Sequence, residues 1–281
     1  MAPRTPARRH RFRLELALTT FNRFLWEGRS WPILSDNRAM SAPSWSLPAA
    51  ITCPGMLADS DNAICAGCYA QLGRYAMRTV AEPQAARLAW MLAHLDNPTD
   101  WIRQVVDALR AANCLYVRLH DSGDWFSIAQ CRAWYEILRR TPEVRYWSPT
   151  RSWRVPHLLP ELRRLHSLPN VTIRPSALHF DAPAPEVEGL GAGMASHHLD
   201  TPQGRECPKT EVGSCAAAGC RACWDAEDGP VSFRAHGHGG THRPTPPSAT
   251  QRKTRLGIVR EFVPLEDVLG VIRRDARGAN G

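Results

Sequence analysis

The chain has 281 residues, of which 43% are hydrophobic and 22% are charged. These proportions are ordinary for a globular protein, and the length suffices for one large core. No apolar run approaches the roughly 18 residues that a membrane-spanning helix needs, which excludes an integral membrane protein. The basic start is interrupted by Glu15 where a signal peptide would be apolar, so we expect a cytoplasmic protein.

The formal net charge of +8 is concentrated at the two ends of the chain. Residues 1–14 contain five arginines and no acid, residues 251–281 carry a net charge of +3, and residues 15–250 are neutral. Any electrostatic attraction to nucleic acid must therefore come from the tails. Basic tails are more often simply solvated than they are binding arms.

The predicted elements begin with helical spacing over residues 14–26 and a short strand over 49–52, which places Cys53 at the carboxyl end of that strand. A regular alternation follows, with helices predicted at 83–95, 101–112, 127–140 and 156–168 and strands at 115–120, 144–148 and 171–174. Ser127 is the predicted N-cap of the third of these helices, with Gln130 at the capping-box position. The strand starts are 29 and 27 residues apart, the length of a βαβ unit, so we expect a parallel sheet.

We divide the chain into four parts. They are a basic N-terminal extension (1–34), a partial (β/α) barrel core (35–181), a second cysteine-rich segment (182–235), and a His/Pro-rich loop with a C-terminal tail (236–281). A last strand is predicted near residues 231–236, and residues 256–272 return to helical or strand character.

Three cysteines, Cys53, Cys65 and Cys68, form the first cysteine group. In a reducing compartment, clustered cysteines indicate metal binding or catalysis before they indicate disulfides. The two residues between Cys65 and Cys68 form a tight turn that lets both thiolates bind one metal centre. Three thiolates suit an iron–sulfur cluster with one iron left open, or a zinc ion completed by a fourth ligand.

Four further cysteines, the second cysteine group, end in another C-x-x-C: Cys207, Cys215, Cys220 and Cys223. This spacing fits a closed zinc site or an auxiliary iron–sulfur cluster, and it does not choose between them. Cys114 and Cys131 are isolated, so we expect them in the core.

A third cluster, His236, His238 and His242, lies in a Gly-rich loop. Such loops are more often solvated than metal-binding.

Polar residues also follow the predicted strands, where ligands bind in parallel α/β sheets. Arg151 and Arg174 would clamp a carboxylate or phosphate through bidentate hydrogen bonds. The alternative for Asp124 is a tight turn in which it caps the next helix. The candidates at these strand ends are His120, Ser122, Gly123, Asp124, Arg151, Arg174 and Ser176.

Several blocks together, WSLPAAITCPG, CYAQLGRY, VRLHDSGDWFS, WSPTRSW and the final CPKT…CRACW, resemble the gene product 88 family of phages and actinobacteria. The resemblance covers about residues 35–236 in the right order. It implies a phage-related protein, and it names no reaction.

A wider similarity is to radical SAM enzymes, which use a partial (β/α) barrel and three cysteines in the loop after the first strand. Cys53, Cys65, Cys68 and the adjacent Tyr69 would match that loop, and the segment 122–124 would match the turn that holds the amino group of S-adenosylmethionine. The similarity implies a [4Fe–4S] cluster, reductive cleavage of S-adenosylmethionine, a substrate radical and a reductant protein. The spacing of eleven and then two residues departs from the usual three and then two.

Two other interpretations remain open. One is an enzyme with a cluster that does not use S-adenosylmethionine. The other is a non-catalytic zinc protein of phage or mobile-element origin that contacts nucleic acid through its basic tails.

Overall fold

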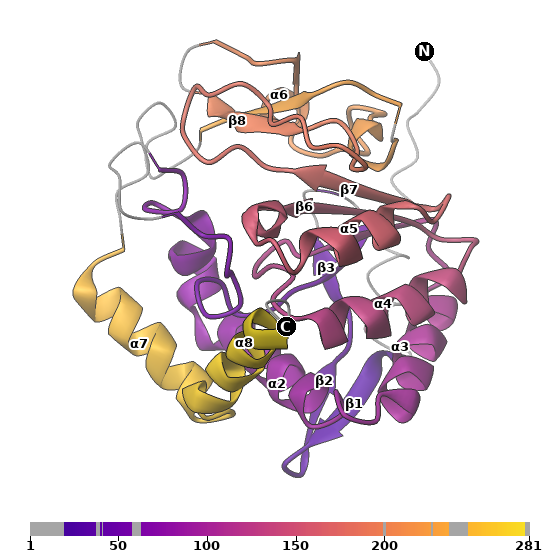
Figure 1. The fold of residues 1–281 in the computed structure, drawn as a ribbon, viewed down its shortest axis with the longest axis vertical. Helices are drawn as coiled ribbons and strands as arrows, with labels where there is room; N and C mark the ends of the chain where they lie inside the picture. The colour runs from indigo at the N-terminus through magenta and orange to yellow at the C-terminus, as the bar shows by residue number, and fades with distance from the viewer. Residues whose placement is uncertain are drawn as a thin grey trace, which may run out of the picture.

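The structure is a computed structural model that describes residues 20–37, 40, 42–57, 63–198, 201–225, 227–235 and 247–278. Figure 1 shows the arrangement of its elements. In chain order they are η1 (Thr20–Asn22), β1 (Arg23–Trp26), β2 (Arg29–Pro32), β3 (Ser35–Asn37), β4 (Ala42–Trp45), η2 (Tyr69–Gln71), η3 (Gly73–Ala76), α2 (Arg78–Leu92), α3 (Thr99–Ala112), β5 (Tyr116–Leu119), α4 (Ile128–Arg139), β6 (Arg145–Thr150), η4 (Ser152–Arg154), α5 (Leu159–His166), β7 (Val171–Pro175), β8 (Met194–His198), β9 (Arg205–Glu206), α6 (Lys209–Val212), η5 (Ala222–Trp224), β10 (Val231–Arg234), α7 (Ala249–Arg260) and α8 (Leu265–Gly278).

The main sheet has five strands in the order β3-β4-β5-β6-β7. Strands β4 to β7 are parallel, and β3 pairs antiparallel with β4 at the edge. The parallel sheet predicted from the strands near 115, 144 and 171 is thus confirmed, with α4 and α5 forming the crossovers.

The first parallel strand is Ala42–Trp45, so the predicted strand at 49–52 is wrong. All four residues of β4 are buried, which removes the alternation by which a half-exposed strand is recognised. Residues 49–52 form a turn instead, in which Ala50 adopts φ +69° and the Thr52 N–H donates to the Pro48 carbonyl (3.3 Å).

The predicted helix over 14–26 is also wrong where the structure describes it, from Thr20 onward. Phe24 is buried between the exposed Arg23 and Leu25, which is the alternation of a strand. Glu27 and Gly28 both have positive φ (49° and 72°), as a two-residue hairpin turn between β1 and β2 requires.

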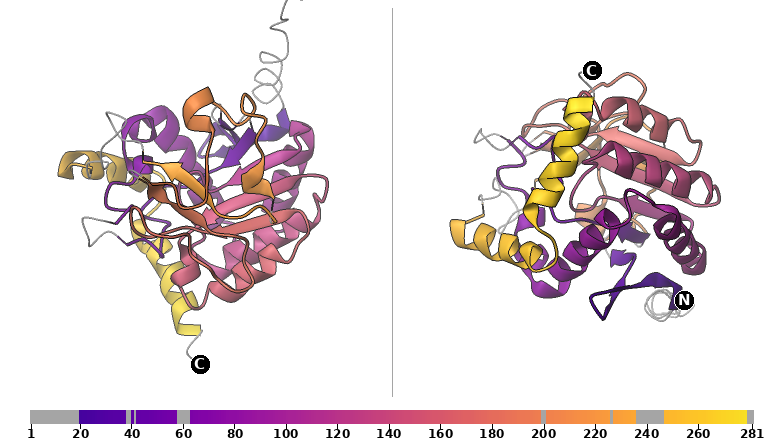
Figure 2. Two further views of the ribbon diagram at one scale, coloured as in Figure 1. Left: turned by 90° about the horizontal axis from the view of Figure 1, so that it is seen from above. Right: turned by 60° about the horizontal axis from the view of Figure 1, so that its bottom comes forward.

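The two faces of the main sheet are covered differently. Val117, Tyr146 and Ile173 point to the core formed with helices α2 to α5. Their neighbours Tyr116 and Trp147 point to the other face, against the second cysteine segment. In Figure 1, α3, α4 and α5 lie below β6 and β7, and the orange segment with β8 and α6 lies above; Figure 2 (left) shows this segment lying across the sheet.

That covering segment contains a small parallel sheet in the order β8-β10-β9. Among the described residues the main sheet therefore ends in two edges, β3 and β7, and does not close on itself. A mixed α/β fold with a mostly parallel sheet is established. The partial-barrel description and the four-part division of the chain stay predictions.

Local signals explain the helix starts. Ser127 caps α4 as predicted, with its Oγ accepting from the Gln130 N–H (3.0 Å). The Gln130 side chain accepts from the Phe126 N–H (2.9 Å), one residue before the capping-box position. Ser248 and Gln251 form a complete capping box at the start of α7.

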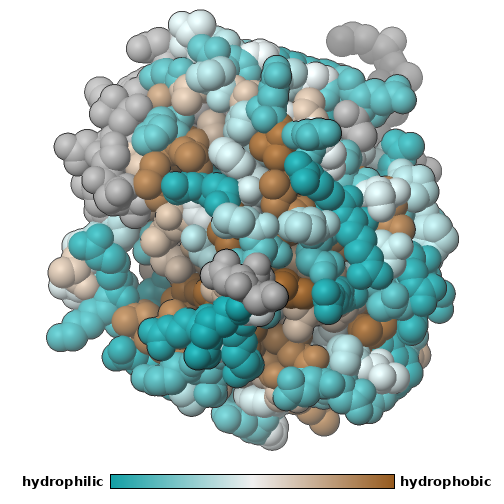
Figure 3. Space-filling model, viewed as in Figure 1, coloured by the Kyte–Doolittle hydropathy of each residue, from teal (hydrophilic) through white to brown (hydrophobic). Residues whose placement is uncertain are grey.

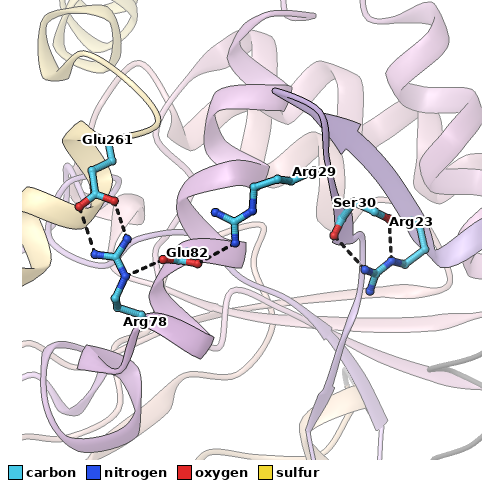
Figure 4. Close-up of polar contacts among 6 residues, drawn as sticks. All are labelled: Arg23, Arg29, Ser30, Arg78, Glu82 and Glu261. Atoms are coloured by element: carbon cyan, nitrogen blue, oxygen red, sulfur yellow. Dashed lines mark hydrogen bonds and ion pairs between the residues drawn. The ribbon is translucent and has the colours of Figure 1, made fainter.

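Helices α7 and α8 replace the single element predicted over 256–272. Helix α7 packs against α2 and against η2 and η3. Figure 4 shows the surface ion pairs that join these parts, with Arg78 bidentate to Glu261 and also bonded to Glu82, which pairs in turn with Arg29. The end of the chain is thus fixed beside the segment that follows Cys68.

None of the helices in the described parts of the chain is both long and apolar enough to cross a bilayer. On the face seen in Figure 3, hydrophilic residues predominate and hydrophobic ones lie between them.

Candidate functional site

A cavity of about 560 Å³ lies between the carboxyl ends of β5 and β6, the segment 49–75 and the second cysteine segment. Six of the seven clustered cysteines line it: Cys53, Cys65, Cys68, Cys207, Cys215 and Cys223. Cys220 and the other three cysteines of the second group line an adjoining space of about 10 Å³. All nine cysteines of the chain are free thiols. The fold therefore brings both cysteine groups to one cavity.

The first cysteine group is held by backbone hydrogen bonds. The Cys68 N–H donates to the Cys65 carbonyl (3.3 Å), which closes the C-x-x-C turn. Just before it, Ala63 bridges to His179 and the Ile64 N–H donates to the Leu178 carbonyl (2.9 Å). The loop that follows β7 thereby positions Cys65 and Cys68.

Burial and repulsion from neighbouring groups raise the pKa of two of these thiols, Cys53 and Cys68. Burial raises the pKa of Cys53 well above its usual value, with further increases from Asp124, Cys68 and Cys65. Burial likewise raises the pKa of Cys68, and Cys65 adds to it. The three thiols are thus close enough to influence one another, and a bound metal would have to displace their protons.

Among the described residues, no group of three or more His, Cys, Asp or Glu side chains has the geometry to hold a metal ion. Residues 58–62, which connect Cys53 to Cys65, lie outside the described part of the chain.

The chemistry around the first group does fit an anionic centre, because Arg255 of α7 lies beside it. Arg255 is 4% exposed, and its buried Nε and Nη1 have no hydrogen-bond partner within the described part of the chain. Its Nη2 reaches Gln84 Oε1 (3.2 Å) and Ser122 Oγ (3.5 Å). Burial lowers the pKa of Arg255, whereas Cys68 and Cys53 raise it. A buried guanidinium without a counter-ion is destabilising, and thiolates holding a metal would supply the missing negative charge.

The loop after β5 positions Cys53. The Leu47 N–H donates to the Ser122 carbonyl (2.9 Å), and the Asp124 N–H donates to the Thr52 carbonyl (3.0 Å). At Gly123, with φ +77°, a Cβ atom would lie 2.6 Å from Thr52 Oγ1. Only glycine therefore allows the loop to approach the turn that precedes Cys53.

Asp124 uses both carboxylate oxygens inside the protein. Oδ1 accepts from the Trp125 N–H (2.8 Å) and Thr150 Oγ1 (2.7 Å), and Oδ2 accepts from the Arg151 N–H (2.8 Å). Burial raises the pKa of Asp124, and these hydrogen bonds oppose the increase. Asp124 lines the cavity as predicted, and its bonds tie the ends of β5 and β6 together.

Arg174 does not take part in the predicted clamp. It is fully buried, and its guanidinium donates only to backbone carbonyls. Because all of these carbonyls belong to the covering segment, Arg174 cannot converge with Arg151, which lines the cavity. The acceptors of Arg174 are the carbonyls of Ala192, Ala222, Cys223, Asp225, Asp228 and Gly229.

The other predicted residues at the strand ends and beside the cysteines do line the cavity, namely Tyr69, His120, Ser122, Gly123, Arg151 and Ser176. Tyr69 donates to the Asp121 carbonyl (2.7 Å) and accepts from Arg118 Nη2 (3.3 Å). Tyr75 donates to Asp121 Oδ2 (3.1 Å). His120 has φ +60°, and burial, with a smaller effect of Arg118, lowers its pKa to about 3.

The second cysteine group is packed against the open face of the main sheet. Trp224 donates from Nε1 to the Val117 carbonyl (2.9 Å), and its own carbonyl accepts from Thr172 Oγ1 (3.0 Å). Burial raises the pKa of Cys223 to about 12, with Cys207 and Cys215 adding to it. These thiols are therefore also close to one another.

Comparison with known proteins supplies the family. The family model described as Gene product 88 matches residues 25–226, which include both cysteine groups and the loop after β5. The chain belongs to the gene product 88 family. No curated protein and no solved structure matches it.

The gene product 88 region ends before α7, so Arg255 reaches the site from outside it. Four residues of the site were not predicted from the sequence: Arg118, Asp121, Tyr75 and Arg255. Arg118 could have been predicted, because it is a charged residue that alternates with the buried apolar residues of β5 and so must point to the other face of the sheet. For Arg255 there was no such signal, because only tertiary packing brings α7 to the cysteines.

Other predictions have different outcomes. Cys114 and Cys131 are buried in the main core, as expected. His236, His238, His242 and the basic residues 1–14 lie outside the described residues. The predictions for that loop and for nucleic-acid binding by the N-terminal tail stay predictions.

Proposed function

We propose that this gene product 88 protein is an iron–sulfur enzyme of the radical SAM type, with a [4Fe–4S] cluster on Cys53, Cys65 and Cys68. When bound, such a cluster supplies the electron for reductive cleavage of S-adenosylmethionine, which yields a radical that takes hydrogen from the substrate. The observation that carries the proposal is the unpaired buried charge of Arg255 beside three cavity-lining thiols.

In this proposal the residues around the first group have separate tasks. Arg255 balances the negative charge of the thiolates from one side, and Arg151, which also interacts with Cys68, adds positive charge. Gly123 keeps the cavity wall close to Cys53, and Ser122 orients Arg255. Burial of Cys53 and Cys68 places these charges in a medium of low dielectric constant, which strengthens their interaction with the two arginines.

For the second cysteine group we propose a single zinc ion. The four cysteines line one small space of about 10 Å³, which is room for a single ion between them. Four thiolates in a tetrahedron form a closed structural zinc site.

The first experiment is anaerobic purification followed by iron, sulfide and zinc analysis. We expect about four iron, about four sulfide and about one zinc per chain. Zinc in both groups without sulfide would end the iron–sulfur proposal and would favour the non-catalytic zinc protein.

The second experiment tests the cofactor. With S-adenosylmethionine and dithionite, the iron-loaded protein should release 5′-deoxyadenosine, and a Cys65→Ala/Cys68→Ala variant should release none. If iron and sulfide are present but no 5′-deoxyadenosine forms, the protein is a cluster enzyme that does not use S-adenosylmethionine.

A further inference from the structure

Three buried polar atoms in the wall of the large cavity have no hydrogen-bond partner among the residues that the structure describes. They are Arg118 Nε, Asp121 Oδ1 and His120 Nδ1. All three residues line the cavity, on the last residues of β5 and just after it. A buried polar atom without a partner is destabilising, and a polar ligand in the cavity would supply partners for this set.

Arg118 lies between the two cysteine groups. Its guanidinium stacks 4.9 Å from the ring centroid of Trp147 on the open face of the sheet. Its charge acts on Tyr69 on one side and on Cys223 on the other. Within the described parts of the chain, no carboxylate lies at ion-pair distance from Arg118, and its terminal nitrogens reach only the Tyr69 hydroxyl and Met40 Sδ (3.3 and 3.5 Å).

The charges that line the cavity favour an anion. Four cationic side chains contribute to the lining: Arg74, Arg118, Arg151 and Lys209. Among the described residues two carboxylates line it, and one of them, Asp124, already accepts three hydrogen bonds from the protein. The other, Asp121, accepts from Tyr75 and Asn37 through Oδ2 and leaves Oδ1 open.

We propose that the cavity binds an anionic ligand whose carboxylate or phosphate group lies against Arg118 and whose neighbouring hydroxyl or amino group donates to Asp121 Oδ1. The ligand body packs against Trp147 and Phe233, which line the same cavity. The volume of about 560 Å³ fits a small molecule or one side chain of a larger one. That this ligand is the enzyme's substrate rests on the proposed function. That the cavity binds an anion does not, because it depends only on the residues that line the cavity.

The test uses four aromatic probes on the anaerobically purified full chain: mandelate, phenylacetate, mandelamide and phenyl phosphate. We expect mandelate to bind more tightly than phenylacetate, because only mandelate has the hydroxyl for Asp121. Mandelamide, which lacks the charge, should bind at least about tenfold more weakly than mandelate, as expected for loss of one charge-assisted hydrogen bond. Phenyl phosphate binding more tightly than phenylacetate would assign the site to phosphate esters, and the reverse order would assign it to carboxylates.

Arg118→Gln should weaken mandelate and phenylacetate about tenfold or more and leave mandelamide unchanged. Asp121→Leu, which removes the acceptor at similar size, should abolish the difference between mandelate and phenylacetate. Arg118→Lys keeps the charge and should retain part of the affinity, which covers the case in which Arg118→Gln does not fold. The matched control is Arg103→Gln, on the exposed face of α3, which should change nothing.

Equal binding of mandelate and mandelamide, or unchanged mandelate affinity in folded Arg118→Gln, would overturn the inference. So would displacement of mandelate by S-adenosylmethionine, since the site would then belong to the cofactor. Metal content measured on the same samples keeps this outcome separate from the proposed function, because an anion can bind here whether or not iron is found.

Discussion

The two cysteine groups line one cavity, and each lies beside a buried arginine, but the two arginines differ. Arg174 donates to six backbone carbonyls of the segment that carries the second group. Arg255 leaves Nε and Nη1 unpaired next to the first group. A guanidinium whose N–H groups all have acceptors (here called saturated) holds a segment in place. One with N–H groups left unpaired (unsaturated) can still donate hydrogen bonds to a bound group. From this difference we propose that the second cysteine group is structural and the first is functional.

The largest expected effect is on metal content. Cys65→Ala/Cys68→Ala should reduce iron from about four per chain to near zero and leave zinc at about one, since the groups are proposed to bind separately. Cys215→Ala/Cys220→Ala should remove the zinc. Elemental analysis checks both, with Cys131→Ala, a core cysteine, as the control that keeps both metals. Loss of both metals in either variant would mean that the groups share one centre.

Replacing the saturated arginine should have the next largest effect. Arg174→Met leaves several buried carbonyls without donors and should lower the free energy of unfolding by about 3–5 kcal/mol. Urea denaturation measures this change. Arg174→Lys should lose less, because one ammonium group still reaches some of the carbonyls. The surface variant Arg164→Met should have little effect, and an equally small effect of Arg174→Met would show that the carbonyl contacts do not matter.

Replacing the unsaturated arginine should act in the opposite direction. Arg255→Met removes a buried unpaired charge, so the metal-free protein should become more stable by about 1–3 kcal/mol. The same variant should retain less iron after purification, because the thiolates lose their counter-charge. Arg255→Lys should retain iron better than Arg255→Met. The exposed Arg78→Met is the control at the same helix interface, and a metal-free Arg255→Met protein less stable than the parent would refute the interpretation.

The smallest effect is a pH dependence near the first group. His120 has a pKa of about 3 in the folded protein, below its unfolded value. The stabilisation from its neutral ring is therefore complete above pH 6.5 and is lost as the pH falls toward 3. At pH 5.5 the loss is about 1.4 kcal/mol.

His120→Asn tolerates the positive φ and does not titrate, so its stability should fall less between pH 7 and pH 5.5. Urea denaturation of both metal-free proteins at the two pH values measures the difference. Parallel curves for the two proteins would assign the acid sensitivity to other groups.

The sequence predicted those parts of the fold that local patterns determine. The strands near 115, 144 and 171 and the helices between them followed from alternating periodicity. Strand β4 was missed because Ala42–Trp45 is buried throughout and contains Pro43, which disfavours a strand assignment. The helix predicted over 14–26 is wrong at β1 because one buried position, Phe24, does not distinguish the two periods in so short a segment.

The site was predictable where its residues are close in sequence. Both cysteine groups follow from their spacing, and the loop 120–124 follows from its place after a strand. Arg174 was assigned to the cavity because a strand end suggested it, yet the alternation of β7 points its side chain into the covering segment. Arg255 depends on the packing of α7 against η2 and η3, which no local pattern encodes.

The position of α7 has a practical consequence for anyone who trims this protein to the region shared with its family. A fragment that stops at residue 226 would omit β10, the central strand of the small sheet, and the only cation that α7 delivers to the first cysteines among the described residues. Such a fragment would retain all seven clustered sulfurs and lose what holds and balances them. Homologues in which a different element packs in the place of α7 would show whether the first cysteine group needs a cation from this position.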